Sequence, residues 1–163
     1  MNYDIKSKIY PNYLAFKTLL DKWKKNKETI VFTNGCFDII HHGHVDSLKR
    51  SAEFGTKLIV GLNSDSSVTL IKGERRPVFS EEARAIILAA FTFVDAVVVF
   101  GEETPADLIA NVIPDVLVKG KEYEIHEIAG HETVLSHGGK VETLDLVPGA
   151  STTEIIDKIK KLD

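Results

Sequence analysis

Cysteine is nearly absent from this sequence, because Cys36 is the single one among 163 residues and no disulfide can form within the chain. Such a chain fits a reducing compartment. The sequence also has no apolar run of membrane-spanning length and no N-terminal segment of the signal-peptide kind. Positive charge is not in excess, since the formal net charge is −4, which argues against a nucleic-acid-binding surface. We therefore expect a cytoplasmic protein that binds neither membranes nor nucleic acid.

The rest of the composition is typical of one globular domain. Hydrophobic residues make up 44% and charged residues 27% of the chain, which is enough to form a core that needs no disulfide or metal. No repeat, linker or low-complexity segment interrupts the sequence. We expect one domain over residues 1–163, in which residues 1–27 form an irregular N-terminal extension followed by a helix that begins at the N-cap Asn12.

The stretch 33–44, T-N-G-C-F-D-I-I-H-H-G-H, carries the strongest chemical signal. It follows the apolar run 29–32, which reads as a buried strand, and it leads into residues 44–54, where apolar side chains recur at helical spacing. A loop between a strand and a helix start exposes unpaired N–H groups and the positive end of the helix dipole, so it can bind an anion. His41 and His44 are three residues apart and would share one helix face. Two imidazoles beside an anion site indicate phosphate chemistry.

A metal site is the competing interpretation of these histidines. A structural zinc site needs four closed ligands, and Cys36 has no second cysteine to pair with. Solvent-exposed histidines in a polar turn are the other simple reading, and the setting between a strand and a helix argues against it.

Five segments, most of them apolar runs, alternate with helical patterns along the chain and are predicted to be buried strands. They cover residues 29–32, 57–62, 95–100, 115–118 and 140–144. Parallel neighbouring strands need crossover connections, and helices supply them here. The predicted fold is α/β, a Rossmann-like doubly wound five-stranded parallel sheet with helices on both faces.

Polar clusters follow four of these strands, at residues 34–44, 63–76, 119–123 and 147–153. Ligands of open parallel sheets bind outside the carboxyl ends of the strands, so these clusters predict the binding edge. The second cluster contains K-G-E-R-R-P, from which Lys72 and Arg75 are candidates for phosphate contact. A solvated turn is the simple alternative for that charge run. Arg84, early in the next helix, is expected to point back to the loop.

The motifs resemble those of a known family. His41-His42-Gly43-His44, preceded by Asn34-Gly35-Cys36-Phe37-Asp38, resembles the H-x-G-H signature of the cytidylyltransferase-like nucleotidyltransferases, and the segment 149–156, G-A-S-T-T-E-I-I, resembles their second phosphate element. Together with segments 63–67, 72–78, 114–120 and 127–130, the pattern is most similar to heptose 1-phosphate adenylyltransferases. In many bacteria these form the carboxyl-terminal half of a bifunctional kinase/adenylyltransferase. No kinase half is present here, so a stand-alone transferase is expected.

The resemblance implies a reaction and its cosubstrates. AMP would pass from ATP to a sugar 1-phosphate, most closely heptose 1-phosphate, giving ADP-heptose and pyrophosphate for surface polysaccharide or lipopolysaccharide synthesis. Mg²⁺ would be held mainly by the phosphates, because no dedicated carboxylate cage is visible. We also expect a homodimer.

Site residues are assigned by matching positions and by chemistry. The catalytic set is His41, His44 and Lys72. The nucleotide-binding set is Asn34, Gly35, Cys36, Phe37, Gly43, Lys119, Gly120, Gly149, Ser151 and Thr152. The substrate-binding set is Asp38, Arg75 and Arg84. Asp38 is expected to face sugar hydroxyls, because a carboxylate repels a triphosphate.

Several alternatives stay open at this point. Glycerol-phosphate cytidylyltransferases carry an arginine just before G-x-S-T-T and an acidic residue after the fourth strand, whereas this chain has Leu146-Val147-Pro148 and Lys119-Gly120-Lys121. These departures argue against CTP and glycerol phosphate but do not separate ATP from GTP. A guanylyltransferase for heptose 1-phosphate, a cytidylyltransferase for another phosphorylated molecule, and a non-catalytic nucleotide-binding module are the other readings.

Overall fold

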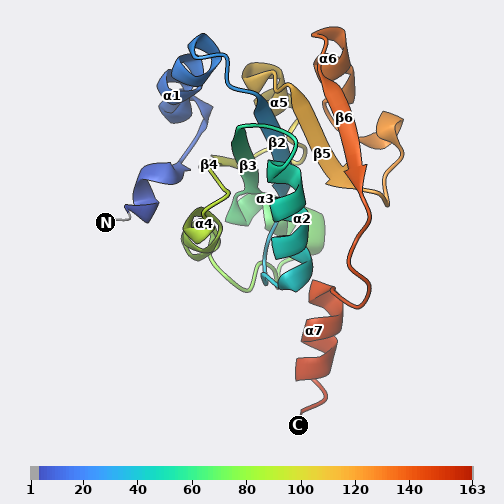
Figure 1. The fold of residues 1–163 in the computed structure, drawn as a ribbon. Coiled ribbons are helices and arrows are strands. Elements are labelled where there is room, and N and C mark those ends of the chain that lie inside the picture. The colour runs from blue at the N-terminus through green and yellow to red at the C-terminus, as the bar shows by residue number, and fades with distance from the viewer. Residues whose placement is uncertain (1–3, 163) are drawn as a thin grey trace.

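A computed structural model describes residues 4–162, and a parallel β-sheet forms its centre (Figure 1). The strands are β1 (Ile9–Tyr10), β2 (Ile30–Gly35), β3 (Lys57–Asn63), β4 (Ala96–Phe100), β5 (Val116–Gly120) and β6 (Lys140–Leu144). Their order in the sheet is β1-β4-β3-β2-β5-β6, and every pair is parallel. The Rossmann-like α/β class predicted from the sequence is thereby confirmed.

The prediction of five strands is wrong by one, because the sheet has six. The additional strand, β1, is two residues long and pairs with β4 at one edge, Ile9 opposite Val97 and Tyr10 opposite Val98. A two-residue edge strand is too short to show the alternation or apolar run that identifies a strand in sequence. Only its pairing with a distant segment defines it.

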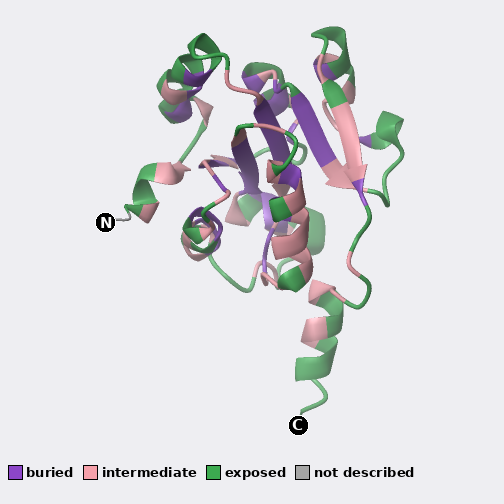
Figure 2. Cartoon of the chain, in the orientation of Figure 1, coloured by how far each residue is buried: buried purple, intermediate pink, exposed green. Residues whose placement is uncertain are grey.

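Two apolar layers cover the two faces of the sheet. Successive residues of β2 point to opposite faces, so Phe32 packs in one core cluster and Val31 in the other. The first cluster joins β2 to helices on one face, the second to helices on the other, and the strands between them are the most buried part of the chain (Figure 2). Near-continuous Val, Ile and Leu in the strands is what burial on both faces requires.

Three of the helices begin at residues whose side chains cap them as the sequence predicts. Their bounds are η1 (Ile5–Lys8), α1 (Tyr13–Lys25), α2 (His42–Ala52), α3 (Asp65–Lys72), α4 (Glu81–Ala90), α5 (Ala106–Val112), η2 (Ile125–Glu127), α6 (His131–Ser136) and α7 (Thr152–Ile159). The side chains of Asn12, Ser80 and Ser151 accept hydrogen bonds from the first turns of α1, α4 and α7. No helix within residues 4–162 combines the length and apolar character that crossing a membrane requires.

The strand order reverses between β2 and β5. From β2 the chain runs through β3 to β4 on one side, and it then crosses back past β2 to β5 and β6 on the other side. A crevice opens outside the carboxyl ends of strands at such a switch point. The loop from Gly35 to His41, which follows β2, lies at this crevice.

Candidate active site

One cavity of about 670 Å³ lies at the carboxyl edge of the sheet. The loop after β2, the start of α2, the end of α3, the loops after β4 and β5, and the start of α7 all contribute to its wall. Of the residues predicted from the sequence, the following line it: Asn34, Gly35, Cys36, Phe37, Asp38, His41, Gly43, His44, Lys72, Lys119, Gly120, Ser151 and Thr152. Segments as far apart in sequence as Asn34 and Thr152 thus meet around one space.

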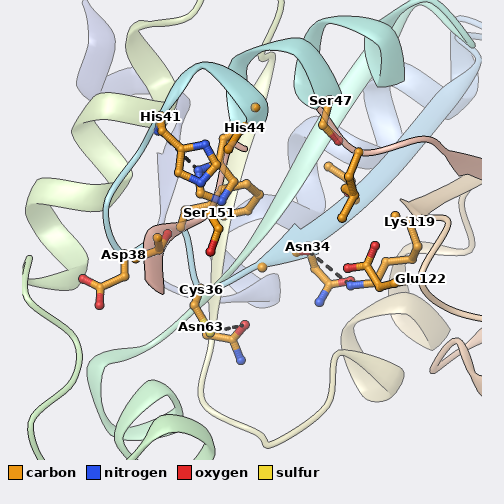
Figure 3. Close-up of a pocket in the computed structure, with 18 of the residues that line it drawn as sticks. Asn34, Cys36, Asp38, His41, His44, Ser47, Asn63, Lys119, Glu122 and Ser151 are labelled. Carbon is orange, nitrogen blue, oxygen red and sulfur yellow. Dashed lines mark hydrogen bonds between the residues drawn. The ribbon is translucent and has the colours of Figure 1, made fainter. Parts of the chain in front are cut away.

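His41 and His44 lie together at the N-terminus of α2. His41 is the N-cap residue and His44 the third residue of the helix, and their rings stack with centroids 3.9 Å apart (Figure 3). The backbone N–H of His41 lies 3.4 Å from Nδ1 of His44. Because Nδ1 accepts this hydrogen bond, the proton of a neutral His44 ring sits on Nε2, which is then a donor.

Both histidines favour the neutral form. Burial and the neighbouring His41 lower the pKa of His44 to about 4, and burial followed by the charge of His42 lowers the pKa of His41. Nδ1 of His41 is buried without a hydrogen-bond partner among residues 4–162. Two neutral imidazoles at a helix N-terminus form a site that donates hydrogen bonds to an anion without requiring a counter-ion in the empty state.

Two glycines allow the close approaches that build this site. The ring of Phe37 covers Gly35, where an added Cβ would lie 3.0 Å from ring atom Cε2, and the same ring meets the His44 ring with centroids 5.4 Å apart. At Gly43 an added Cβ would lie 2.7 Å from Cβ of Ala150. The glycine of H-x-G-H therefore lets the segment before α7 touch the start of α2, which couples the two phosphate motifs.

The N-terminus of α7 forms a second wall of the cavity. Ser151 is its N-cap and accepts a hydrogen bond from the N–H of Glu154, and the Thr152 hydroxyl donates to the carbonyl of Ile39 at 3.3 Å. Gly149 is not part of the cavity wall; its φ of +71° makes the turn that leads into the helix. Two helix N-termini, those of α2 and α7, therefore face the same space.

Lys119 supplies a cation from the end of β5. Its Nζ lies 3.2 Å from Oδ1 of Asn34 and 5.5 Å from the centroid of the Tyr123 ring. Burial lowers the pKa of Lys119, while the nearby Glu122 carboxylate opposes that shift. An anion that entered beside Nζ would favour the charged form and raise the pKa again.

The Asp38 carboxylate is bonded to protein groups, whereas the sequence led us to expect it to face sugar hydroxyls. One oxygen accepts hydrogen bonds from the N–H groups of Val78 and Phe79 at 2.7 and 3.1 Å, and the other pairs with Nε of Arg76 at 2.5 Å. Figure 3 shows the carboxylate turned away from the histidine pair. Burial would raise the pKa of Asp38, but the hydrogen bonds from Arg76, Phe79 and Val78 outweigh burial and lower it. This carboxylate is occupied in holding the segment after α3.

The two arginines assigned to the substrate also lie elsewhere. Arg84 is fully buried beneath the loop, with its guanidinium bonded to protein groups, and Arg75 is exposed outside the cavity wall. Helical spacing places Arg84 near the loop but does not show on which side of it. Lys72 is exposed at the last position of α3 and lines the cavity.

Other residues of the cavity wall were given no role from the sequence. Among them are Ser47, Arg76, Glu103, Thr104, Glu122, Tyr123 and Thr153. Glu103 and Thr104 follow β4, and the rule that ligands bind at the carboxyl ends of strands could have found them. Glu122 and Tyr123 directly follow the Lys119-Gly120-Lys121 segment and belong to the polar cluster 119–123, so an acidic residue does follow the strand. Within residues 4–162 no three His, Cys, Asp or Glu side chains are grouped as a metal site requires.

A comparison with protein families gives a match to the cytidylyltransferase-like family model over residues 32–158. The matched region begins within β2 and ends within α7, so it contains both phosphate motifs and every strand from β3 onward.

Curated relatives share about half of their aligned residues with this chain. Proteins named "Bifunctional protein HldE" are 52% identical over 142 residues in Campylobacter jejuni, 51% over 138 residues in Geobacter sulfurreducens and 48% over 145 residues in Syntrophotalea carbinolica. The alignments cover 87%, 85% and 89% of this chain but 30%, 28% and 30% of those proteins. The chain thus spans about a third of the length of the relatives it matches.

A solved structure shares the fold. The crystal structure titled as the lipopolysaccharide core biosynthesis protein from Thermoplasma volcanium superposes with a TM-score of 0.60 at 25% sequence identity. The superposition covers 74% of this chain and 97% of that one.

Proposed function

Because this chain belongs to the cytidylyltransferase-like family, we propose that it is a single nucleotidyltransferase domain that transfers AMP from ATP to heptose 1-phosphate, with release of pyrophosphate. The observation that carries this proposal is the stacked pair His41 and His44, at a helix N-terminus that faces the N-terminus of α7 across one cavity. Two of the comparisons support a sugar phosphate as the acceptor. They are the relatives named "Bifunctional protein HldE" and the solved structure titled as a lipopolysaccharide core biosynthesis protein.

The attacking atom needs little activation. The second pKa of a phosphate monoester is about 6, so at neutral pH the acceptor's phosphate oxygen is largely anionic. This oxygen forms a bond to the α-phosphorus, and the bond from that phosphorus to the bridging oxygen breaks as pyrophosphate leaves. The domain must therefore align the two substrates and stabilise the negative charge that collects on the α-phosphate oxygens.

The cavity offers donors of the required kind. Nε2–H of His44 would donate to an α-phosphate oxygen, with His41 stacked beside it. Lys72 and Lys119 would offset the remaining charge, and Ser151 and Thr152 at the start of α7 would contact the β and γ phosphates. These roles use neutral histidines, which agrees with the lowered pKa of both rings.

Magnesium would enter with the nucleotide as MgATP. The carboxylates on the cavity wall are those of Asp38, Glu103 and Glu122, and none is grouped with further ligands into a metal site in the described residues. The phosphates would supply most of the ion's oxygen ligands, as is usual for Mg²⁺ in nucleotide sites.

A pyrophosphate-release assay tests the proposal directly. Purified protein with Mg²⁺ is incubated with ATP, GTP or CTP, each against heptose 1-phosphate, glycerol 3-phosphate and phosphopantetheine. We expect release with ATP and heptose 1-phosphate. Release with GTP alone, or with another acceptor alone, would contradict that part of the assignment, and no release from any pair would contradict nucleotidyl transfer.

Glu122 replaces Asp38 as the carboxylate that would bind acceptor hydroxyls. It lies on the cavity wall beside Lys119, on the side of the view away from the histidines (Figure 3). We expect Glu122→Gln to raise KM for heptose 1-phosphate about tenfold, because a hydrogen bond to a charged group contributes about 1.5–3 kcal/mol, with KM for ATP changed less than about twofold. Initial rates with one substrate varied at a time measure both constants.

Glu132→Gln is the matched control, since Glu132 is exposed in α6 and outside the cavity wall. It should leave both constants unchanged. If Glu122→Gln instead raised KM for ATP alone, the carboxylate would be assigned to the nucleotide.

Lys72, the last residue of α3, gives a further test of the cavity wall. Lys72→Ala should lower kcat about tenfold or more, because the ammonium would act on charge that develops in the transition state. The melting temperature should change little, because an exposed lysine contributes little to folding. Normal kcat with a lowered melting temperature would show that Lys72 has only a structural role, and Arg75→Ala is the exposed control outside the cavity wall.

A further inference from the structure

Arg84 is a fully buried cation that contacts the loop after β2, the loop proposed above to bind phosphate. Its Nη1 donates to the carbonyls of Cys36 at 2.6 Å and Asn63 at 2.8 Å, and its Nε donates to the carbonyl of Phe79 at 3.0 Å. Nη2 pairs with Oδ1 of Asp65 at 2.8 Å, although the Asp65 side chain is 45% exposed. One guanidinium therefore joins the loop after β2, the end of β3, the start of α3 and the segment before α4.

Stability alone does not account for a charge at this position. Buried ion pairs are often no more stabilising than apolar residues of the same volume, because removing the charges from water offsets their attraction. The strongest contact of Arg84, by distance, is with the carbonyl of Cys36. The effect of the guanidinium on that peptide group is thus the feature that an apolar side chain could not reproduce.

Arg84 binds the carbonyl oxygen of the peptide group that joins Cys36 to Phe37. The bond is trans, so its C=O and N–H point in opposite directions. Arg84 is not part of the cavity wall, whereas Cys36 and Phe37 are, so the N–H of Phe37 is directed to the cavity side. Within residues 4–162 this N–H donates to no protein acceptor. A charged donor on the carbonyl also polarises the peptide and strengthens its N–H as a donor.

The backbone at Phe37 is held in an uncommon conformation. Its φ of +47° lies in the left-handed region, which a bulky residue adopts only where surrounding contacts impose it. Contacts exist on both sides: Arg84 binds the carbonyl of Cys36, and the Asp38 carboxylate is held by Arg76 and two backbone N–H groups. Such strain is a means of fixing the direction of a functional group before the ligand arrives.

We propose that Arg84 is a positioning residue for nucleotidyl transfer, which holds and polarises the Cys36–Phe37 peptide so that the Phe37 N–H donates to a phosphate oxygen of the nucleotide. The inference rests on the proposed function for the identity of the ligand. Arg84 acts through the peptide and touches no substrate itself.

Amide NMR together with steady-state kinetics tests this role. In the wild-type protein, the Phe37 amide proton should move downfield when MgATP is added, as expected for a new charge-assisted hydrogen bond. Arg84→Lys keeps the charge but offers a single ammonium in place of the fork, so it cannot hold all four contacts. We expect this variant to lose most of the Phe37 shift and to lower kcat roughly tenfold, which is less than the 10²–10³ lost when an oxyanion donor is removed outright.

Asp65→Asn is the matched control, because it removes the ion pair of Arg84 and leaves the contact with Cys36. It should lower the melting temperature yet retain the Phe37 shift and a kcat within about threefold of wild type. An Arg84→Lys protein with a normal Phe37 shift and normal kcat would overturn the proposal, whatever its melting temperature. A missing Phe37 shift in the wild-type protein under saturating MgATP would overturn it as well. If no substrate pair released pyrophosphate, the proposed function would fail, while the NMR titration with MgATP would still decide the role of Arg84.

Discussion

Replacing His44 with alanine is expected to lower kcat by about 10²-fold or more, because the variant lacks the Nε2–H donor aimed at the α-phosphate. The neutral ring receives a hydrogen bond at Nδ1 from the His41 backbone, which fixes both its tautomer and its orientation. If this donor acts mainly in the transition state, KM for ATP should change much less than kcat. Steady-state rates of pyrophosphate release give both values.

His42→Ala is the matched control, since His42 lies between the two site histidines but is exposed. It should keep kcat within about threefold of wild type. The pH profile gives a second check: because the pKa of His44 is about 4, kcat/KM should show no loss from its protonation above about pH 5. A His44→Ala protein with wild-type kcat would remove His44 from the mechanism.

Replacing Asp38 with asparagine is expected to destabilise the protein by about 3 kcal/mol or more, because it leaves Arg76 without its partner and weakens two backbone hydrogen bonds. The Asp38 side chain is 2% exposed and that of Arg76 19% exposed, so solvent cannot replace the lost contacts fully. For a chain of this size, such a loss lowers the melting temperature by about 6–12 °C. Urea unfolding and thermal melting measure the change.

The pH dependence of this difference has a definite sign. The folded state lowers the pKa of Asp38, so the stabilisation is complete above the unfolded pKa of about 3.9 and is lost as pH falls through the lower folded value. Wild type and Asp38→Asn should therefore differ by a constant amount from pH 8 to about pH 5 and converge only in acid. Asp21→Asn is the control, because its pair with Lys17 is exposed on α1 and should contribute less than about 1 kcal/mol. Equal stability of Asp38→Asn and Asp21→Asn at neutral pH would show that the Asp38 contacts are not structural.

The fold class and the place of the site could be read from local patterns. The predicted strands 57–62 and 140–144 correspond to β3 at Lys57–Asn63 and β6 at Lys140–Leu144. The first is a largely apolar run, whereas the second, K-V-E-T-L, contains only two apolar residues. The N-caps Asn12, Ser80 and Ser151 were also predictable, because capping depends on a side chain and the N–H three residues later. The spacing of His41 and His44 predicted a shared helix face, and the two rings stack there.

The roles of the charged residues could not be predicted in the same way. Asp38 meets Arg76 38 positions later, and Arg84 meets the Cys36 carbonyl 48 positions earlier, so each pairing exists only after β2, β3 and α4 have packed together. Whether a carboxylate or guanidinium faces a ligand or a protein partner depends on which side of the loop it occupies, and residue spacing carries no information about that side. For the same reason the sequence assigned no role to Glu122, although it lies in the polar cluster 119–123, and β1 became a strand only through its pairing with β4. Periodicity and capping determine local structure, whereas burial and partners distant in sequence determine what each charge does.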